Sequence, residues 1–461
     1  MEEQEESTMS SPQSGSDQSG EPVIKSPPES IFGTLSCLGP SMILSASIVG
    51  SGELIMTTTL GARAGFVALW VIIVSCLVKV CVQLEFGKHA ISSGESSMAA
   101  LGALRGPRLA SARWAIWMWL IVQLVIFFQY GGIVTGVGQA LNIAVPQIPE
   151  WCWTCAAGLT TAVLISFGRY RLIQNVSIAL MALFTFFTLL CVGLLQGTEY
   201  AISSDQIASG LQFQLPSAVI GAAVAAFGLT GVGASEVIAY PYWCLEKGYA
   251  GFTGPRQESE AWVTRARGWI RVMYWDAFLS MLVYTLVTCG FFALGAAVLH
   301  GSGEIPEGAE MIRTLSRIYT ESAGAGAMAL YLLGAIIVLF STLFAGTAAW
   351  TRMFSDAFSR FGLLDYSNPT ERQRWIRGFA WFFPLSWTAL GLTFKTPVIM
   401  VGAGGVANAA LLLLVVYAAY TFRYSRLPLE LRPGRLYDML LWTSFVSITA
   451  IGVFAVIKVV G

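Results

Sequence analysis

Eleven apolar segments, each long enough to cross a lipid bilayer, follow one another along the chain after residue 30. Only 12% of the 461 residues are charged, whereas soluble chains average about 25%. Backbone inside a bilayer must satisfy its own hydrogen bonds, so the segments are predicted to be helices. The sequence therefore predicts an all-α polytopic membrane protein with eleven transmembrane helices. The predicted helices cover residues 38–63, 66–86, 114–138, 151–167, 172–196, 217–244, 270–299, 325–350, 375–393, 396–421 and 436–460.

The distribution of basic residues predicts the orientation. A cytosolic N-terminus puts 21 of the 27 Lys and Arg residues on the cytosolic side and 5 on the other side, with Lys79 inside the second segment. Such an excess is typical of cytosolic loops. Residues 1–30 are rich in serine and acids and have too few apolar residues to form a core. We therefore expect a disordered acidic cytosolic tail over residues 1–30 and an integral membrane domain over residues 31–461, in a bacterial plasma membrane.

Two similar heptapeptides stand in the first and sixth segments, which would cross the membrane in opposite directions. Residues 49–55 read VGSGELI and residues 232–238 read VGASEVI. Their small residues favour unwound backbone, which is tolerated at membrane depth only where it is buried in protein or lines a cavity. The pair predicts inverted repeats over about 31–197 and 217–421, broken helices 1 and 6, and an extra helix at 436–460. Breaks at matching positions of two inverted halves indicate a transporter's substrate site.

Each heptapeptide also carries a glutamate, Glu53 or Glu236, at membrane depth. A carboxylate there is costly unless it is paired, protonated or coordinated, so both are candidates for binding substrate and for ligating a metal ion. The alternative is that Gly- and Ser-rich helices pack closely and the glutamates are hydrogen-bonded or reach toward the membrane surface. The other predicted substrate-binding residues are Gly50, Ser51, Gly231, Ala234, Ser235 and Asn408, the last with helix packing as the alternative role.

Lys79 is placed near the middle of the second segment, and two interpretations remain open. Its long side chain reaches toward the cytosol, or it pairs with Glu53 or Glu236. In the second case a fixed ammonium group would offset carboxylate charge or replace a coupling cation.

The stretch GPSMILSASIVGSGELIMTTTLGARAGFVALWVIIVSCLV, residues 39–78, resembles the first two helices of the Nramp family of divalent-metal transporters. The shared features are the Gly-Pro opening, the broken first helix, the later Gly-Ala and Ala-Gly pairs and the aromatic second helix. The resemblance implies the LeuT-type scaffold of two inverted five-helix repeats. It also implies a divalent cation as substrate, moved by alternating access.

The site motifs depart from the family pattern. The family's first-helix Asp-Pro-Gly-Asn aligns with residues 50–53, and its sixth-helix Met-Pro-His aligns with residues 234–236. A ligating aspartate and a soft thioether are therefore absent, and the remaining oxygen ligands suit hard ions such as Mg²⁺, Mn²⁺ or Ca²⁺. The family's third-helix acids have no counterpart in residues 127–142, so we expect no proton coupling by that route.

These features favour a transporter of a hard divalent cation such as Mg²⁺ or Mn²⁺. The alternative is a secondary transporter of a small organic solute, an amine or an amino-acid-like molecule, on the same scaffold. The chain shows no nucleophile–base set and no phosphate-binding loop, so we expect neither an enzyme nor a resident cofactor. A formal net charge of zero gives no reason to expect a nucleic-acid partner, and the lipid bilayer is the expected surrounding.

Overall fold

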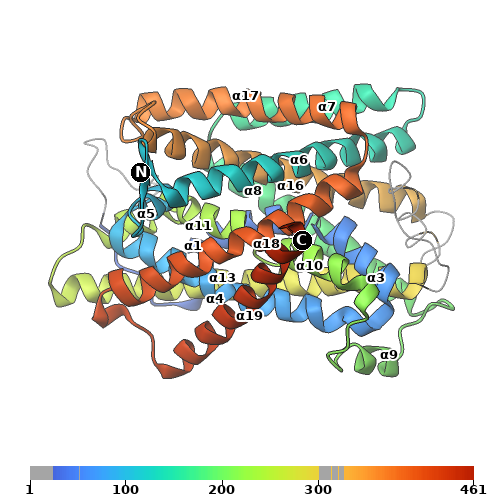
Figure 1. The fold of residues 1–461 in the computed structure, drawn as a ribbon, viewed down its shortest axis with the longest axis horizontal. Coiled ribbons are helices and arrows are strands. Elements are labelled where there is room, and N and C mark those ends of the chain that lie inside the picture. Colours follow the sequence, from blue (N-terminus) through green and yellow to red (C-terminus); the bar gives the residue numbers. More distant parts are fainter. Residues whose placement is uncertain (1–23, 51, 301–312, 314–319, 321–326, 461) are drawn as a thin grey trace, which may run out of the picture.

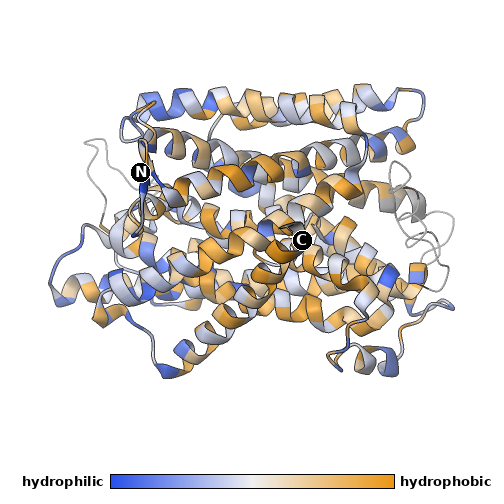
Figure 2. Ribbon diagram, in the orientation of Figure 1, coloured by the Kyte–Doolittle hydropathy of each residue, from blue (hydrophilic) through white to orange (hydrophobic). Residues whose placement is uncertain are grey.

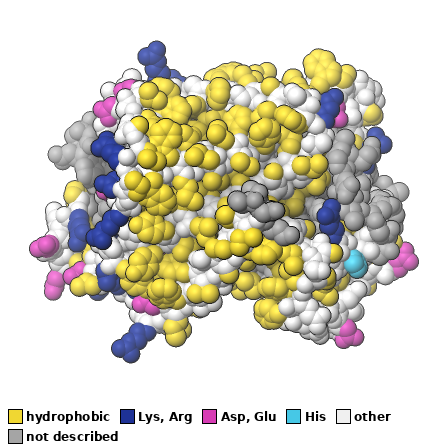
Figure 3. Space-filling model, in the orientation of Figure 1, with side chains coloured by type: hydrophobic (Ala, Val, Ile, Leu, Met, Phe, Trp, Pro, Cys, Tyr) yellow, Lys and Arg dark blue, Asp and Glu magenta, His cyan; other side chains and the backbone are white. Residues whose placement is uncertain are grey.

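The computed structural model describes residues 24–50, 52–300, 313, 320 and 327–460 (Figure 1). Its long helices run side by side along the horizontal axis of Figure 1, and the described part of the chain has one short hairpin, β1 (Arg108–Leu109) with β2 (Ala112–Arg113). Orange residues dominate the middle of the helices in Figure 2, and blue residues gather toward their ends. Figure 3 shows hydrophobic side chains over the middle of this face, with Lys and Arg along its edges. This is the surface expected of a protein that lies in a bilayer.

The first half of the chain forms one broken and several continuous helices. Its elements are α1 (Ile31–Cys37), α2 (Pro40–Ile48), η1 (Gly52–Thr57), α3 (Thr58–Ala64), η2 (Gly65–Ala68), α4 (Leu69–Ser93), α5 (Ser97–Gly102), α6 (Trp114–Ala144), α7 (Glu150–Ser166), α8 (Tyr170–Leu195) and α9 (Ser204–Ser209).

The second half repeats this pattern and adds a final helix. Its elements are η3 (Ser217–Val219), α10 (Ile220–Leu229), α11 (Ala234–Lys247), α12 (Tyr249–Thr253), α13 (Glu260–Leu294), η4 (Gly295–Leu299), α16 (Ala327–Arg360), α17 (Pro369–Phe394), α18 (Pro397–Thr421), η6 (Phe422–Arg426), η7 (Leu429–Leu431) and α19 (Arg435–Val460).

The prediction of broken first and sixth helices is confirmed. Val49 and Gly50 after α2 are not helical, and neither are the residues between α10 and α11. By length and composition, 8 helical runs among the described residues are able to cross a membrane, or 9 if the bent pair α1 and α2 is one span. This criterion takes Gly52–Ser93 as a single run, although Gly65, with a φ of 62°, separates α3 from α4. The count of eleven spans and the repeat boundaries stay predictions.

Two groups of helices pack around the broken pair. The helices α6, α7 and α17 pack on one another along the upper side of Figure 1, and α16 packs against both α6 and α8. The helix α13 packs on α4, and α18 connects the groups by packing on α6, α10 and α19. The broken helices are therefore packed among other helices, with α2 against α8 and α16, and α10 against α18.

Candidate substrate site at the two helix breaks

The first break exposes backbone carbonyls that hydroxyl groups of α16 satisfy. After Ile48 the backbone turns to an extended conformation at Val49. Thr342 donates from Oγ1 to the carbonyl of Ser47 over 3.2 Å, and Ser341 lies 3.5 Å from the carbonyl of Val49. A Cβ atom at Gly50 would lie 1.3 Å from Oγ1 of Thr342. Glycine is therefore required at position 50 because α16 approaches the backbone so closely.

The second break also depends on glycine. Gly231 has a φ of 61°, a conformation that side chains disfavour. A Cβ atom there would lie 2.8 Å from Cα of Cys76 on α4. The break leaves the carbonyls of Phe227 and Thr230 without helical partners, and groups from α4 bind both of them.

The two breaks lie side by side. The position of a Cβ atom at Gly52 is 3.0 Å from Cβ of Leu229, where α10 ends. The hydroxyl of Ser47 lies 3.4 Å from Oε1 of Glu236, where α11 begins. The helix α2 thus packs on α11 while η1 packs on α10, as expected for two inverted halves that meet at their breaks.

The two glutamates occupy equivalent places in the broken helices. Each stands three residues after a glycine at the break, Gly50 before Glu53 and Gly233 before Glu236. Oε2 of Glu53 accepts a hydrogen bond from the backbone N–H of Gly50 over 3.0 Å. Oε2 of Glu236 lies 2.4 Å from the position of a Cβ atom at Gly233. A carboxylate in the first turn of a helix binds the free N–H groups there and is stabilised by the helix dipole.

The glutamates differ in what else they contact. Glu53, in the π-helical turn η1, is completely buried, and its Oε1 lies 3.4 Å from Oγ1 of Thr288 on α13. Glu236 is partly exposed and lines a small cavity of about 10 Å³, which has room for about one water molecule. Glu236 is therefore the carboxylate that is open to a substrate, whereas both oxygens of Glu53 already have donors.

The cavity is built by α2, α6, α11 and α16. Serine, tyrosine and carboxylate groups face one another across it, and tryptophan and methionine side chains complete the wall. Its lining residues are Leu44, Ser47, Tyr130, Ser235, Glu236, Ala239, Trp243, Ala345, Ala349, Trp350 and Met353. Of the predicted binding residues, only Ser235 and Glu236 are among them. No sequence signal points to Tyr130, Trp350 or Met353, because each lies in an ordinary apolar helix.

Asn408 and Ser235 hold the start of α11. Oδ1 of Asn408 lies 3.3 Å from the backbone nitrogen of Ser235, and its Nδ2 donates to the carbonyl of Gly404 over 3.2 Å. The hydroxyl of Ser235 accepts from Nε2 of Gln123 over 3.1 Å. Asn408 therefore binds the backbone next to the cavity. Ala234 is fully buried beside it.

Lys79 does not pair with Glu53 or Glu236, the two partners that the sequence suggested. Its side chain is fully buried, and Nζ donates to the carbonyl of Phe227 over 2.6 Å and to the carbonyl of Thr230. Within the described residues it makes no ion pair with Glu53 or Glu236. Ser51, the remaining predicted site residue, lies outside the described residues.

A metal ion would find few charged ligands here. Among the described residues there is no group of three or more His, Cys, Asp and Glu side chains arranged to hold a metal ion. The oxygen ligands among the lining residues are the carboxylate of Glu236 and the hydroxyl groups of Ser47, Tyr130 and Ser235.

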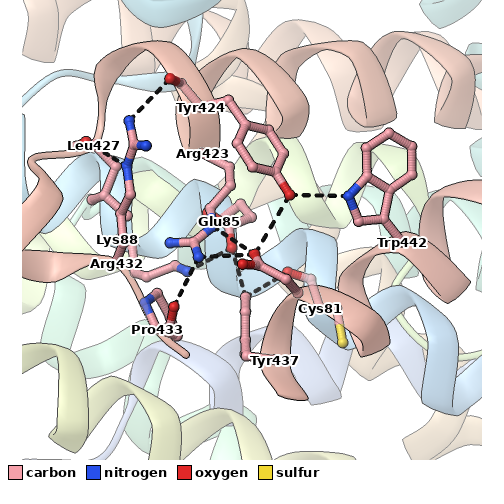
Figure 4. Close-up of polar contacts among 11 residues, drawn as sticks. Cys81, Glu85, Lys88, Arg423, Tyr424, Leu427, Arg432, Pro433, Tyr437 and Trp442 are labelled. Carbon is pink, nitrogen blue, oxygen red and sulfur yellow. Dashed lines mark hydrogen bonds and ion pairs between the residues drawn. The ribbon is translucent and has the colours of Figure 1, made fainter. Parts of the chain in front are cut away.

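A second buried polar cluster lies away from the breaks, where α4 meets η6 and α19 (Figure 4). Nζ of Lys88 is 2.5 Å from Oε1 of Glu85, and the hydroxyl of Tyr437 donates to the same oxygen over 2.7 Å. Arg423 binds Asp438 through Nη2 over 2.8 Å. This cluster joins α19 to the scaffold and contributes nothing to the cavity.

A family model described as natural resistance-associated macrophage protein-like, abbreviated Nramp, matches residues 41–458. The metal transporter Nramp6.2 of Populus trichocarpa is 27% identical over 133 residues, which are 29% of this chain and 23% of that protein. An uncharacterized protein of Pasteurella multocida is 25% identical over 326 residues, 66% of each chain. The chain thus spans less than two thirds of the length of these relatives.

Solved structures show the same fold. A mutant of the manganese transporter of Eremococcus coleocola matches with a TM-score of 0.72 and 16% identity, over 94% of this chain and 88% of that chain. The nucleobase-cation-symport-1 family transporter MHP1 matches with a TM-score of 0.59 and 14% identity, over 92% of each chain.

Proposed function

The chain belongs to the natural resistance-associated macrophage protein-like (Nramp) family, and we propose that it moves a hard divalent cation such as Mg²⁺ or Mn²⁺ by alternating access. The observation that carries this proposal is the meeting of the two helix breaks beside a cavity that Glu236 lines. Broken helices of this kind form substrate sites near the bilayer centre.

The chemistry of the cavity supports a hard ion. Hydroxyl and carboxylate oxygens from Ser47, Ser235 and Glu236 surround it. Such oxygens are the ligands that Mg²⁺ and Ca²⁺ prefer, and Mg²⁺ keeps several of its waters when it binds. One carboxylate with neutral oxygens therefore suits a hard ion, and the cavity as it stands leaves room for about one water molecule beside these ligands. Glu53 lies behind the cavity, where its oxygens accept from the backbone of Gly50 and lie near the hydroxyl of Thr288, so it holds the first turn of η1 next to the site.

The proposed transport cycle does not use the family's usual proton route, which runs through acidic residues of the third helix. The helix α6 carries no acidic side chain over its whole length, Trp114–Ala144. Glutamine stands at the buried polar positions Gln123, Gln129 and Gln139, and an amide cannot take up and release a proton at physiological pH.

A second candidate substrate is a small organic cation, such as an amine. The aromatic rings of Tyr130, Trp243 and Trp350 line the same cavity as the single carboxylate of Glu236. Aromatic faces attract organic ammonium groups, and a carboxylate adds charge pairing. The lack of a group of three ligands for a metal ion among the described residues also favours this candidate.

Titration calorimetry on the purified protein separates the two candidates. Mg²⁺, Mn²⁺, Ca²⁺ and a series of methylated amines are titrated into the wild-type protein and into Glu236→Gln. The proposal expects saturable heat with a divalent cation that is lost in Glu236→Gln and retained in Glu258→Gln, a variant of an exposed loop residue. Binding of an amine with no response to any of the three metals would establish the second candidate instead.

A further inference from the structure

The ammonium group of Lys79 lies at the end of the first half of helix six. It is fully buried, and it donates to the carbonyls of Phe227 and Thr230. The ring of Phe227 also lies under it, with the centroid 4.8 Å from Nζ. The hydroxyl of Ser75, four residues earlier on α4, lies 3.1 Å from each of the same carbonyls. Two carbonyl oxygens and one aromatic ring therefore contact the ammonium group, and Ser75 binds the same two carbonyls.

This position has the chemistry of a cation site. The C-terminal end of α10 carries the negative end of a helix dipole, and the break leaves its last carbonyls without partners in the helix. In transporters with broken helices, such carbonyls and half-helix ends coordinate the coupling cation. The helix end and its carbonyl oxygens thus give the site a negative potential as well as oxygen ligands.

We propose that Lys79 is a tethered cation that permanently fills a coupling-ion position at the sixth-helix break, so that transport needs no free Na⁺ or K⁺. This inference rests on the proposed function, because it describes how that transport is coupled. The proposed ion position is separate from the substrate cavity, since Lys79 is not one of the residues that line the cavity.

The competing explanation is that Lys79 only caps the end of α10 by hydrogen bonding. The need for a positive charge distinguishes a coupling-ion replacement from such a cap. A cap needs only a hydrogen-bond donor for the two carbonyls. A replacement for a coupling ion needs the positive charge, because the negative potential of the site remains when the lysine is removed.

Lys79→Ala removes Cγ, Cδ, Cε and Nζ, which together have the shape of propylammonium. Thermal unfolding is measured on wild type, Lys79→Ala and Lys79→Met with propylammonium, Na⁺, K⁺ or neutral 1-propanol, at constant ionic strength set by N-methylglucamine. We expect saturable stabilisation of Lys79→Ala by propylammonium and by Na⁺ or K⁺, and none by 1-propanol. Wild type and Lys79→Met should not respond, because a side chain fills the space. Equal stabilisation by 1-propanol, or none by any cation, would overturn the proposal.

Flux in liposomes gives the second readout. Wild-type flux should stay unchanged when N-methylglucamine replaces all Na⁺ and K⁺. Lys79→Ala should lose about tenfold in flux, since two buried carbonyls lose a charged donor, and should recover with propylammonium. A wild type that requires Na⁺ or K⁺ would refute the inference. If the wild type carries no substrate at all, the proposed function fails, and the unfolding experiment still decides the role of Lys79.

Discussion

The backbone N–H of Gly50 donates a hydrogen bond to the side chain of Glu53 over 3.0 Å. This bond closes the first break, because it joins the unwound backbone at Gly50 to the first turn of η1. Glu236 and Gly233 repeat the same spacing in the second break, where the carboxylate again lies next to the glycine three residues before it. Both breaks thus have the same local arrangement, a glutamate side chain next to the backbone of the glycine three residues before it.

Gly50→Ala should destabilise the protein by about 3 kcal/mol, the cost of strong overpacking, because the new Cβ atom meets Oγ1 of Thr342 at 1.3 Å. Thermal unfolding in detergent measures this loss. The matched control is Gly378→Ala on α17, where nothing lies within 4 Å of the new Cβ atom. That change should leave stability equal or raise it by up to about 1 kcal/mol. Equal stability of the two variants would show that α16 does not hold the first break closed.

Glu53→Gln and Glu236→Gln should each impair transport by about tenfold or more while leaving the protein folded, because glutamine keeps the shape and removes the charge. The double variant should be no worse than the poorer single variant, as expected for groups that act together. Flux of the preferred cation in liposomes, with circular dichroism as the folding control, checks this. Normal transport by both single variants would make these residues structural.

Substrate cation binding should weaken as the pH falls, because protons and the cation compete for the carboxylate of Glu236. Calorimetry at a series of pH values should show this dependence in wild type and a flatter profile in Glu236→Gln. The same pH dependence in both would assign the competing proton to another group.

Metal transport should show no preference for transition metals. Ala234 supplies no sulfur at the sixth-helix break, and the thioether of Met353 in the cavity wall is the only sulfur among the lining residues that the structure describes. Competition flux with Mg²⁺, Mn²⁺, Ca²⁺ and Cd²⁺ measures the preference. A strong preference for Mn²⁺ or Cd²⁺ that disappears in Met353→Leu would identify Met353 as a soft ligand and contradict the prediction.

Glu95, in the turn between α4 and α5, gives a pH-dependent contribution to stability outside the membrane. A hydrogen bond with His89, whose Nε2 is 3.1 Å from Oε2, lowers the pKa of Glu95. A lowered pKa in the folded state stabilises the protein above the unfolded-state pKa, and this contribution is lost as the pH falls through the folded-state value. The carboxylate is about half exposed, so the effect is small. Thermal unfolding between neutral and acidic pH should show a shallower acid loss for Glu95→Gln than for Glu258→Gln.

The sequence by itself determined the helices and the two breaks. Long apolar runs leave no other way to satisfy backbone hydrogen bonds in a bilayer, and the small residues of the two heptapeptides mark where a helix stops and restarts. These signals are local, because each involves neighbours within one helical turn. Glu53 and Glu236 could be singled out from them, and so could the inverted relation of the two halves.

Only the tertiary structure decided what each of these residues contacts. Thr342 lies almost three hundred residues from Gly50 in the chain, and Thr230 lies 151 residues from Lys79, so no local pattern predicts either approach. The packing of α2 against α11 leaves Glu236 open to the cavity and encloses Glu53 beside α13. An apolar helix carries the same sequence pattern whether its tryptophans face lipid, core or cavity. The choice among these is made when the helices pack, because it depends on which surfaces they bury against one another.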